Sequence, residues 1–226
     1  METLKFDDLT QGGFAGLIER RFVMDQRVFG ASKNPGVFDG IGNFVYLADA
    51  NFLPHGETGM HGHREIDVIS VMVDGRVSHA GSLEHGQSLQ SGAAQVQRAG
   101  AEGFKHNEIN PDDSQNNMIQ LWVMPDEAGE AAGYKMYEPK PGEVTHIYGG
   151  PKGQDDTFYS GTSISVANPH KGQTIKQEGT VMAYLTHGKG TINGEVVDGR
   201  TLVRSDNGVE FVAAEDSQLI LIYLTS

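Results

Sequence analysis

Two short histidine-containing motifs carry the side chains best suited to chemistry in this chain. One residue separates His61 from His63, and one residue separates His106 from Glu108. Side chains two apart on a β-strand point to the same face, so each pair can direct two side chains at one point. Neutral imidazole is the commonest metal ligand among side chains. The two pairs together predict a metal site of three imidazoles and one carboxylate.

The composition of this ligand set narrows the type of site. The chain has no cysteine, whereas closed structural zinc sites usually contain it. Imidazole and carboxylate suit Fe(II), and also Mn, Co, Ni, Cu or Zn, so ligand type does not choose among these metals. Four protein ligands leave one or two positions open on a five- or six-coordinate metal, where water, substrate or oxygen can bind. The alternative is that these histidines are ordinary surface or core residues.

The elements that must position the motifs are expected to be strands. Short apolar segments recur along the chain, separated by Gly, Asp or Asn, and this rhythm predicts an all-β sandwich or barrel. Asn193-Gly194 predicts a tight hairpin turn, and one short helix is expected around Asp8 to Arg20. The expected strands are 43–48, 66–73, 76–80, 94–98, 118–124, 144–148, 163–167, 181–186, 195–197, 201–203, 209–213 and 219–224.

The chain of 226 residues is long enough for two β domains. Prolines and glycines interrupt residues 125–160, which we interpret as a linker carrying one strand. We therefore predict an N-terminal metal-binding barrel over residues 1–125, and a linker followed by a C-terminal barrel over residues 126–226. The second half has no His-x-His pair, and its isolated His170 and His187 predict no ligand role, so this barrel is expected to be metal-free.

Charge and hydropathy exclude several function classes. The net charge is −13 and the isoelectric point is near 5.0, which argues against direct contact with nucleic-acid phosphates or anionic membranes, because such contacts need clustered Lys and Arg. No basic-then-apolar leader and no apolar run of membrane-spanning length is present. We expect a cytoplasmic protein.

Beyond the two pairs, a longer series of motifs resembles the pirin family of the cupin superfamily, in order and roughly in spacing, over residues 40–125. A weaker resemblance continues through the C-terminal half, which looks like a second cupin barrel. The matching residues are His61-Gly62-His63-Arg64, Glu65, Asp67, Gly75, Ser78-His79, Gly81-Ser82-Leu83, Gly92, Val96-Gln97-Arg98-Ala99-Gly100, Gly103-Phe104, His106-Asn107-Glu108, Asn110-Pro111, Ile119-Gln120-Leu121-Trp122-Val123 and Pro125.

The resemblance implies a site and a cofactor. In pirins the residues matching His61, His63, His106 and Glu108 bind a single iron, so Fe(II) is the expected metal. General cupins take their acidic ligand from the position of Asp67 instead. We favour Glu108 as the ligand, because the shorter Asp67 side chain reaches less far from its strand, and we expect Asp67 to orient a ligand histidine by a hydrogen bond.

The resemblance leaves two functions open. Several pirins oxidise the flavonol quercetin with oxygen and cleave its heterocyclic ring, which implies a dioxygenase with an aromatic or enolic small-molecule substrate. In that case Glu108 is also the candidate catalytic residue, because a carboxylate at the metal can accept a proton from a phenolic hydroxyl. Other pirins bind protein partners, which implies a metal-containing regulatory module. The local sequence does not decide between these hypotheses.

The remaining residues near the motifs have structural interpretations. His55, His79 and His85 are expected to be ordinary residues that bind no metal. Trp122 is interpreted as a core residue in preference to a platform for a substrate.

Overall fold

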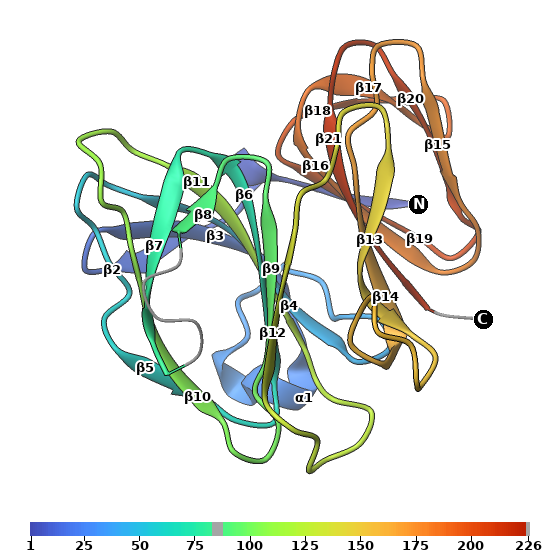
Figure 1. The fold of residues 1–226 in the computed structure, drawn as a ribbon. Coiled ribbons are helices and arrows are strands. Elements are labelled where there is room, and N and C mark those ends of the chain that lie inside the picture. Colours follow the sequence, from blue (N-terminus) through green and yellow to red (C-terminus); the bar gives the residue numbers. More distant parts are fainter. Residues whose placement is uncertain (83–87, 225–226) are drawn as a thin grey trace. The chain divides into compact units, whose positions relative to one another are not determined.

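The computed structural model describes residues 1–82 and 88–224, which form strands joined by short loops (Figure 1). The chain divides into two compact units. The N-terminal unit comprises Leu9–Gly40 and Val45–Glu138, and the C-terminal unit comprises Met1–Asp8, Ile41–Phe44 and Pro139–Ser226. The predicted all-β class is confirmed.

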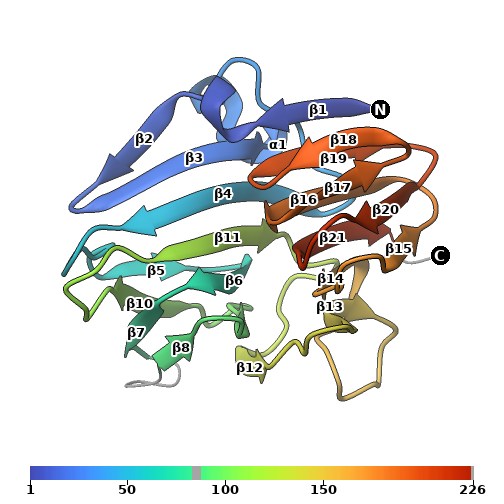
Figure 2. The same cartoon turned by 90° about the horizontal axis from the view of Figure 1, so that it is seen from above.

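Two sheets make up the N-terminal unit. The larger has the strand order β12-β9-β6-β11-β4-β3-β2, and the smaller has the order β5-β10-β7-β8 (Figure 2). Each sheet is open, so the unit is built as two facing layers and is not a closed barrel. The strands of the larger sheet are β2 (Gln11–Phe14), β3 (Leu17–Met24), β4 (Phe44–Phe52), β6 (Asp67–Asp74), β9 (Ala94–Arg98), β11 (Asn117–Val123) and β12 (Gly133–Tyr137). Those of the smaller are β5 (His61–His63), β7 (Arg76–Gly81), β8 (Ser88–Gln90) and β10 (Phe104–Ile109).

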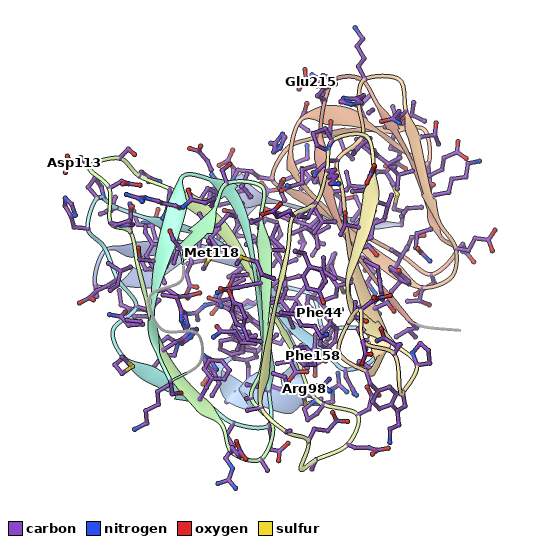
Figure 3. The ribbon with its side chains drawn as sticks, in the orientation of Figure 1. Phe44, Arg98, Asp113, Met118, Phe158 and Glu215 are labelled. Carbon is purple, nitrogen blue, oxygen red and sulfur yellow. The ribbon has the colours of Figure 1, made fainter. Side chains whose placement is uncertain are left out.

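A hydrophobic core joins these two sheets at one end. Phe52, Met72 and Met118 of the larger sheet pack with Val77 and Leu89 of the smaller one. Met118 is labelled in Figure 3. All five are buried, with at most 2% of each residue exposed. Burial of apolar area at about 25 cal/mol per Å² makes this layer a main source of stability for the unit. The other end of the interface contains polar side chains, and the histidine motifs lie there.

The C-terminal unit repeats the two-sheet plan. A six-stranded sheet has the order β1-β19-β16-β21-β14-β13, and a four-stranded sheet has the order β15-β20-β17-β18. Apolar side chains such as Val203, Phe211 and Leu219 form its core. Its strands are β1 (Glu2–Lys5), β13 (Val144–Gly150), β14 (Ser160–Ala167), β15 (Thr174–Gln177), β16 (Val181–His187), β17 (Lys189–Ile192), β18 (Glu195–Asp198), β19 (Thr201–Ser205), β20 (Val209–Ala213) and β21 (Gln218–Leu224).

Two sequence expectations about boundaries differ from the structure. Strand β1 pairs with β19 of the C-terminal unit, and β12, inside the expected linker, pairs with β9 of the N-terminal unit. Along the sequence, the N-terminal unit therefore ends at Glu138 and not at residue 125, and Met1–Asp8 and Ile41–Phe44 belong to the C-terminal unit. These pairings join residues far apart in sequence, which local composition cannot reveal.

The helix expected around Asp8 to Arg20 is wrong: β2 and β3 form a hairpin there. Gly13 has a φ of 132°, and a Cβ at this position would lie 2.0 Å from the carbonyl oxygen of Leu17. Glycine is also poor in helices, so the local sequence favours the hairpin. The helical elements of the described chain are η1 (Phe6–Asp8), α1 (Gln26–Phe29) and η2 (Gly30–Ser32). None of the helices among the described residues has the length and apolar character needed to cross a bilayer.

The hairpin predicted at Asn193-Gly194 is confirmed. These two residues connect β17 and β18 and have φ values of 51° and 85°. Positive φ at both central positions defines the tight turn that fits the twist of the strands. The strands predicted from the apolar segments are all present, with ends that differ by a few residues.

We expect Gly81→Ala to destabilise the N-terminal unit, because a Cβ at Gly81 would lie 2.3 Å from the carbonyl oxygen of Lys105 in the neighbouring strand β10. Forcing the strands apart should cost about 1–3 kcal/mol in the free energy of unfolding, measured with urea. Gly62→Ala is the matched control. Its Cβ would make ordinary contacts at 3.6 Å, so its effect should stay within about 0.5 kcal/mol. Equal losses in the two variants would contradict this account.

Candidate metal centre

The three predicted histidine ligands come from two neighbouring strands. β5 pairs with β10 in antiparallel register, with His61 opposite His106 and His63 opposite Phe104. Side chains of directly opposed residues lie on the same face of a sheet. The register therefore places all three imidazoles on the face of the smaller sheet that looks toward the larger one.

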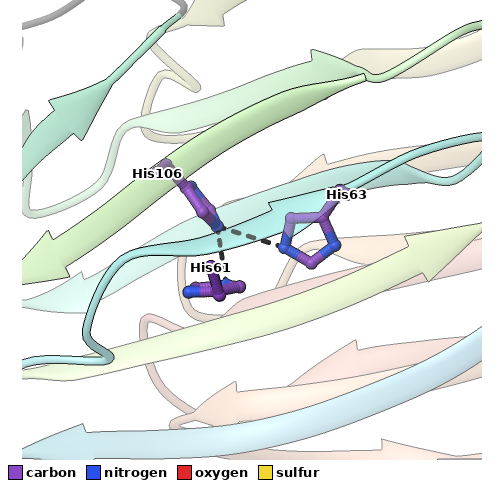
Figure 4. Close-up of side chains that lie close together, drawn as sticks. All are labelled: His61, His63 and His106. Atoms are coloured by element: carbon purple, nitrogen blue, oxygen red, sulfur yellow. Dashed lines mark hydrogen bonds between the residues drawn. The ribbon is translucent and has the colours of Figure 1, made fainter. Parts of the chain in front are cut away.

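The three imidazoles point at one another (Figure 4). The Nε2 atom of His106 lies 3.0 Å from that of His61 and 3.2 Å from that of His63. The ligand atoms of the three residues all lie within 4.8 Å of one another. Two nitrogens bound to a metal at about 2.1 Å, and separated by an angle of about 90–109°, are about 3.0–3.4 Å apart. The observed spacings fit a shared metal ion.

Hydrogen bonds on the outer ring nitrogens of His61 and His106 hold these two rings with Nε2 toward the centre of the cluster. The Nδ1 atom of His61 lies 2.9 Å from the carbonyl oxygen of Gly59, to which it donates. The Nδ1 atom of His106 lies 3.1 Å from Nε2 of His79. When His106 Nδ1 donates this proton, His106 has the tautomer that a ligand requires.

Burial favours the neutral form of two of the imidazoles, those of His63 and His106. Burial lowers the pKa of His63 to about 4, helped by the neighbouring His61. Burial also lowers the pKa of His106 to about 2, together with the charges of the surrounding His61, His63 and His79. Three imidazoles at this spacing repel added protons, whereas a single divalent cation satisfies all three lone pairs. The pKa shifts therefore agree with a metal site.

Glu108 is placed on the same face of β10, but it is not in the group of ligand atoms within 4.8 Å of one another. Its carboxylate is fully buried, and its Oε1 accepts a hydrogen bond of 3.2 Å from Ser70. Oε2 has no hydrogen-bond partner among the described residues. Burial raises the pKa of Glu108 to about 7 against the opposing hydrogen bond from Ser70. A buried carboxylate oxygen without a hydrogen-bond partner needs some other partner, and a cation is a suitable one.

The second acidic candidate, Asp67, has a different environment. Its expected partner was a ligand histidine, and the partner found is Arg98, whose Nε lies 3.0 Å from Oδ2 of Asp67. Arg98, which is labelled in Figure 3, also contacts Glu130, so this arginine lies between two carboxylates. Both Asp67 and Arg98 are buried. Asp67 thus belongs to an ion pair between β6 and β9.

His79 is the residue that sequence reasoning missed. It is 3% exposed, contacts His106 as described, and lies 3.1 Å from Nε2 of Gln97. It remains outside the convergent histidine group, so it orients a candidate ligand instead of being one. One sequence feature could have pointed to this role of His79. The polar residues Gln95 and Gln97 alternate on the buried strand β9, which indicates a polar interior face where a buried histidine can find partners. His55 pairs with Asp113 at 2.8 Å on the surface, and His85 lies outside the described residues.

A cavity of about 570 Å³ opens beside the histidines. Trp122 is partly exposed in it, and its ring stacks on Tyr46 with centroids 4.4 Å apart. The Trp122 ring also meets His63 edge to face at 5.6 Å, so it is a cavity wall as well as a core residue. The lining residues are Phe14, Leu17, Glu19, Arg21, Tyr46, Thr58, His61, Gly62, His63, Arg64, Ile66, Gln120 and Trp122.

These features define a class: a protein of two cupin-like domains with a histidine cluster that can hold a metal in the first domain. Residues 31–123 match the Pirin family model. The fold matches the crystal structure of the bacterial pirin YhhW from Escherichia coli in complex with nickel(II), with a TM-score of 0.83 and 19% identity over 99% of this chain and 98% of that one. The resemblance to the pirin family is confirmed.

Two further matches carry an enzyme name. A quercetin 2,3-dioxygenase from Escherichia coli O157:H7 is 23% identical over 176 residues, which cover 74% of this chain and 75% of that protein. A crystal structure of quercetin 2,3-dioxygenase from Acinetobacter baumannii matches with a TM-score of 0.69 and 20% identity, over 98% of this chain and 85% of that one.

The first prediction for this site concerns metal stoichiometry. We expect one nickel(II) per chain by equilibrium dialysis, and none in His106→Ala. His79→Phe should weaken binding by about 10–100-fold, because it removes the hydrogen bond that fixes the His106 ring. Asp67→Asn should keep full stoichiometry. Loss of the metal in Asp67→Asn together with its retention in Glu108→Ala would reverse our choice of carboxylate.

The second prediction concerns pH. In metal-free protein the pKa of Glu108 is about 7, above its ordinary value, so the folded state holds a proton that the unfolded state releases. Glu108 therefore costs stability as pH rises from about 4.5 through 7, by on the order of 3 kcal/mol in total. Glu108→Gln removes this cost. Its free energy of unfolding, measured with urea at pH 4.5 to 8, should rise relative to wild type as pH increases. A difference that stays constant with pH would contradict the buried, protonated carboxyl.

Proposed function

We propose that this chain is a mononuclear metal-dependent dioxygenase that acts on flavonols or related enolic and phenolic compounds. The observation that carries the proposal is the convergence of three Nε2 atoms at the edge of a cavity of about 570 Å³, into which His61 and His63 face. Ligand cavities commonly measure about 300–1,000 Å³. The enzyme names of similar proteins support the same substrate class.

In this proposal His61, His63 and His106 hold the metal, and Glu108 is its fourth ligand. Fe(II) is the proposed metal, because the resemblance to pirins implies iron. The imidazole and carboxylate donors fit Fe(II) as they fit other divalent metals, and the similar E. coli pirin was crystallised in complex with nickel(II). A bound Fe(II) would supply Lewis acidity and a one-electron redox partner.

Glu108 has a second role in the proposal, as the proton acceptor for a phenolic or enolic hydroxyl. A carboxylate held beside the metal lies within reach of a hydroxyl that binds there, which is the placement that a general base requires. Ser70 fixes the orientation of this carboxylate by donating its hydroxyl hydrogen to Oε1. Ile66 and Trp122 on the cavity wall exclude part of the water from around the substrate.

Oxygen consumption tests the proposal. Fe(II)-loaded protein should consume oxygen with quercetin, with matching loss of flavonol absorbance. Glu108→Gln should lower kcat by about 10²–10⁴-fold, without a matching loss of folding stability. His61→Ala with the same added iron controls for oxidation by free metal.

The regulatory hypothesis predicts a different outcome. No oxygen uptake across a panel of flavonols and enols, combined with recovery of a stoichiometric protein partner only when metal is present, would replace the enzyme proposal.

A further inference from the structure

The cavity wall opposite the histidine strand carries a polar cluster that the metal chemistry does not use. Glu19 and Arg21 alternate along β3, so both side chains face the cavity. Arg21 donates from Nε to Oε1 of Glu19 at 2.8 Å. Tyr46, on the adjacent strand β4, donates its hydroxyl hydrogen to Oε2 of Glu19 at 3.0 Å. Glu19 is only 5% exposed, and its charge is held by these two partners.

An aromatic surface lies next to this cluster. Trp122, on β11, stacks on Tyr46, and Phe29 stacks behind them with its centroid 5.5 Å from that of Tyr46. The order β11-β4-β3 puts Trp122, Tyr46 and Glu19 on three successive strands of one sheet. One continuous wall therefore offers a flat apolar surface followed by a charged polar edge.

The polar edge has unused hydrogen-bonding capacity. A carboxylate has about four acceptor positions and a guanidinium has five N–H donors. Glu19 takes two donors from Arg21 and one from Tyr46, which leaves acceptor capacity on Oε2. Arg21 lines the cavity and has 32% of its side chain exposed, so N–H donors that Glu19 does not use are accessible there. A hydroxyl group both donates and accepts, and so matches a carboxylate beside a guanidinium.

A purely structural role explains this cluster less well. Replacing a buried ion pair with apolar side chains is often neutral or stabilising, and Leu17 on the same face of β3 shows that apolar residues are accommodated there. The ion pair lines the cavity itself. The ion pair is therefore placed to bind a ligand that carries complementary polar groups.

We propose that Glu19 and Arg21 bind the hydroxyl groups of the substrate's outer aromatic ring, which rests on Trp122, while the oxidised ring faces His61 and His63. This inference rests on the proposed function for its substrate class. The substrate selected by this wall would be a flat aromatic compound with hydroxyl groups at the end remote from the reacting centre. Glu19 accepts a hydrogen bond from one hydroxyl, and Arg21 donates to its oxygen or to that of a neighbouring hydroxyl.

Trp122 is the single tryptophan of the chain, so its fluorescence reports occupancy of the cavity without any turnover. The experiment titrates zinc-loaded protein, in which the metal has no redox chemistry, with two flavonols. Quercetin carries two adjacent hydroxyls on its outer ring, and galangin is the same molecule without them. Wild type should bind quercetin about tenfold more tightly than galangin.

Three variants make the test specific. Arg21→Met and Glu19→Gln should each reduce quercetin affinity about tenfold and leave galangin affinity unchanged, so that the preference disappears. Gln120→Leu is the matched control, because Gln120 lines the same cavity outside the cluster, and it should keep the preference. Since Glu19 is buried, thermal unfolding is measured for each variant, and the half-exposed Arg21 carries the test if Glu19→Gln does not fold.

The inference is overturned if wild type binds the two flavonols equally, if neither changes Trp122 fluorescence, or if the variants weaken both ligands to the same extent. Oxygen uptake is measured in parallel on iron-loaded protein. A retained quercetin preference without oxygen uptake would reject the enzymatic proposal and keep the binding site. Oxygen uptake with no preference would reject the Glu19–Arg21 site alone.

Discussion

The register between β5 and β10 is the constraint on which the site depends. His61 lies opposite His106, and these strands hold all three imidazoles on one face. Because side chains alternate with a period of two, a slip of one residue would turn His61 and His63 away from His106. Gly81 in β7 allows a close approach to β10 from its other side. The neighbours of β10 thus determine where His106 and Glu108 lie.

The same arrangement buries imidazoles and a carboxyl group close together, and this combination favours the binding of a cation. Burial and mutual repulsion hold the pKa values of His63 and His106 far below the ordinary value. A short distance away, burial raises the pKa of Glu108. A divalent cation attracts the imidazole lone pairs and a carboxylate together, so it would reverse the unfavourable desolvation of both kinds of group. Protons neutralise Glu108 but do not suit the imidazoles, because each charge added to the histidine cluster raises the cost of the next.

The sequence allowed the histidine triad to be predicted, because spacing of two on a strand is a local property. His61, His63 and His106 meet as expected. The role of His79 could not be read in the same way, since it depends on β7 lying beside β10. The pairing of Asp67 with Arg98 likewise depends on the register between β6 and β9.

Fold class followed from the rhythm of apolar segments, whereas unit boundaries did not. Strand β1 joins a sheet whose next strand, β19, begins about two hundred residues later, and no local pattern encodes such a partner. The failed helix at Asp8–Arg20 has a local cause: its glycines permit a hairpin that other residues would resist.

The hydrogen bonds that hold Glu108 continue across the larger sheet to β12, a strand inside the segment that the sequence predicted to be a linker. Ser70 donates to Glu108, and the side-chain amide of Gln95 lies 3.4 Å from the Ser70 hydroxyl. Tyr134, on β12, in turn donates to the Gln95 carbonyl oxygen at 3.2 Å. Each side chain in this hydrogen-bonded series limits the orientation of the next one, because a buried polar atom that loses its partner costs free energy. The edge strand β12 therefore helps to fix which oxygen of Glu108 is hydrogen-bonded and which has no hydrogen-bond partner among the described residues.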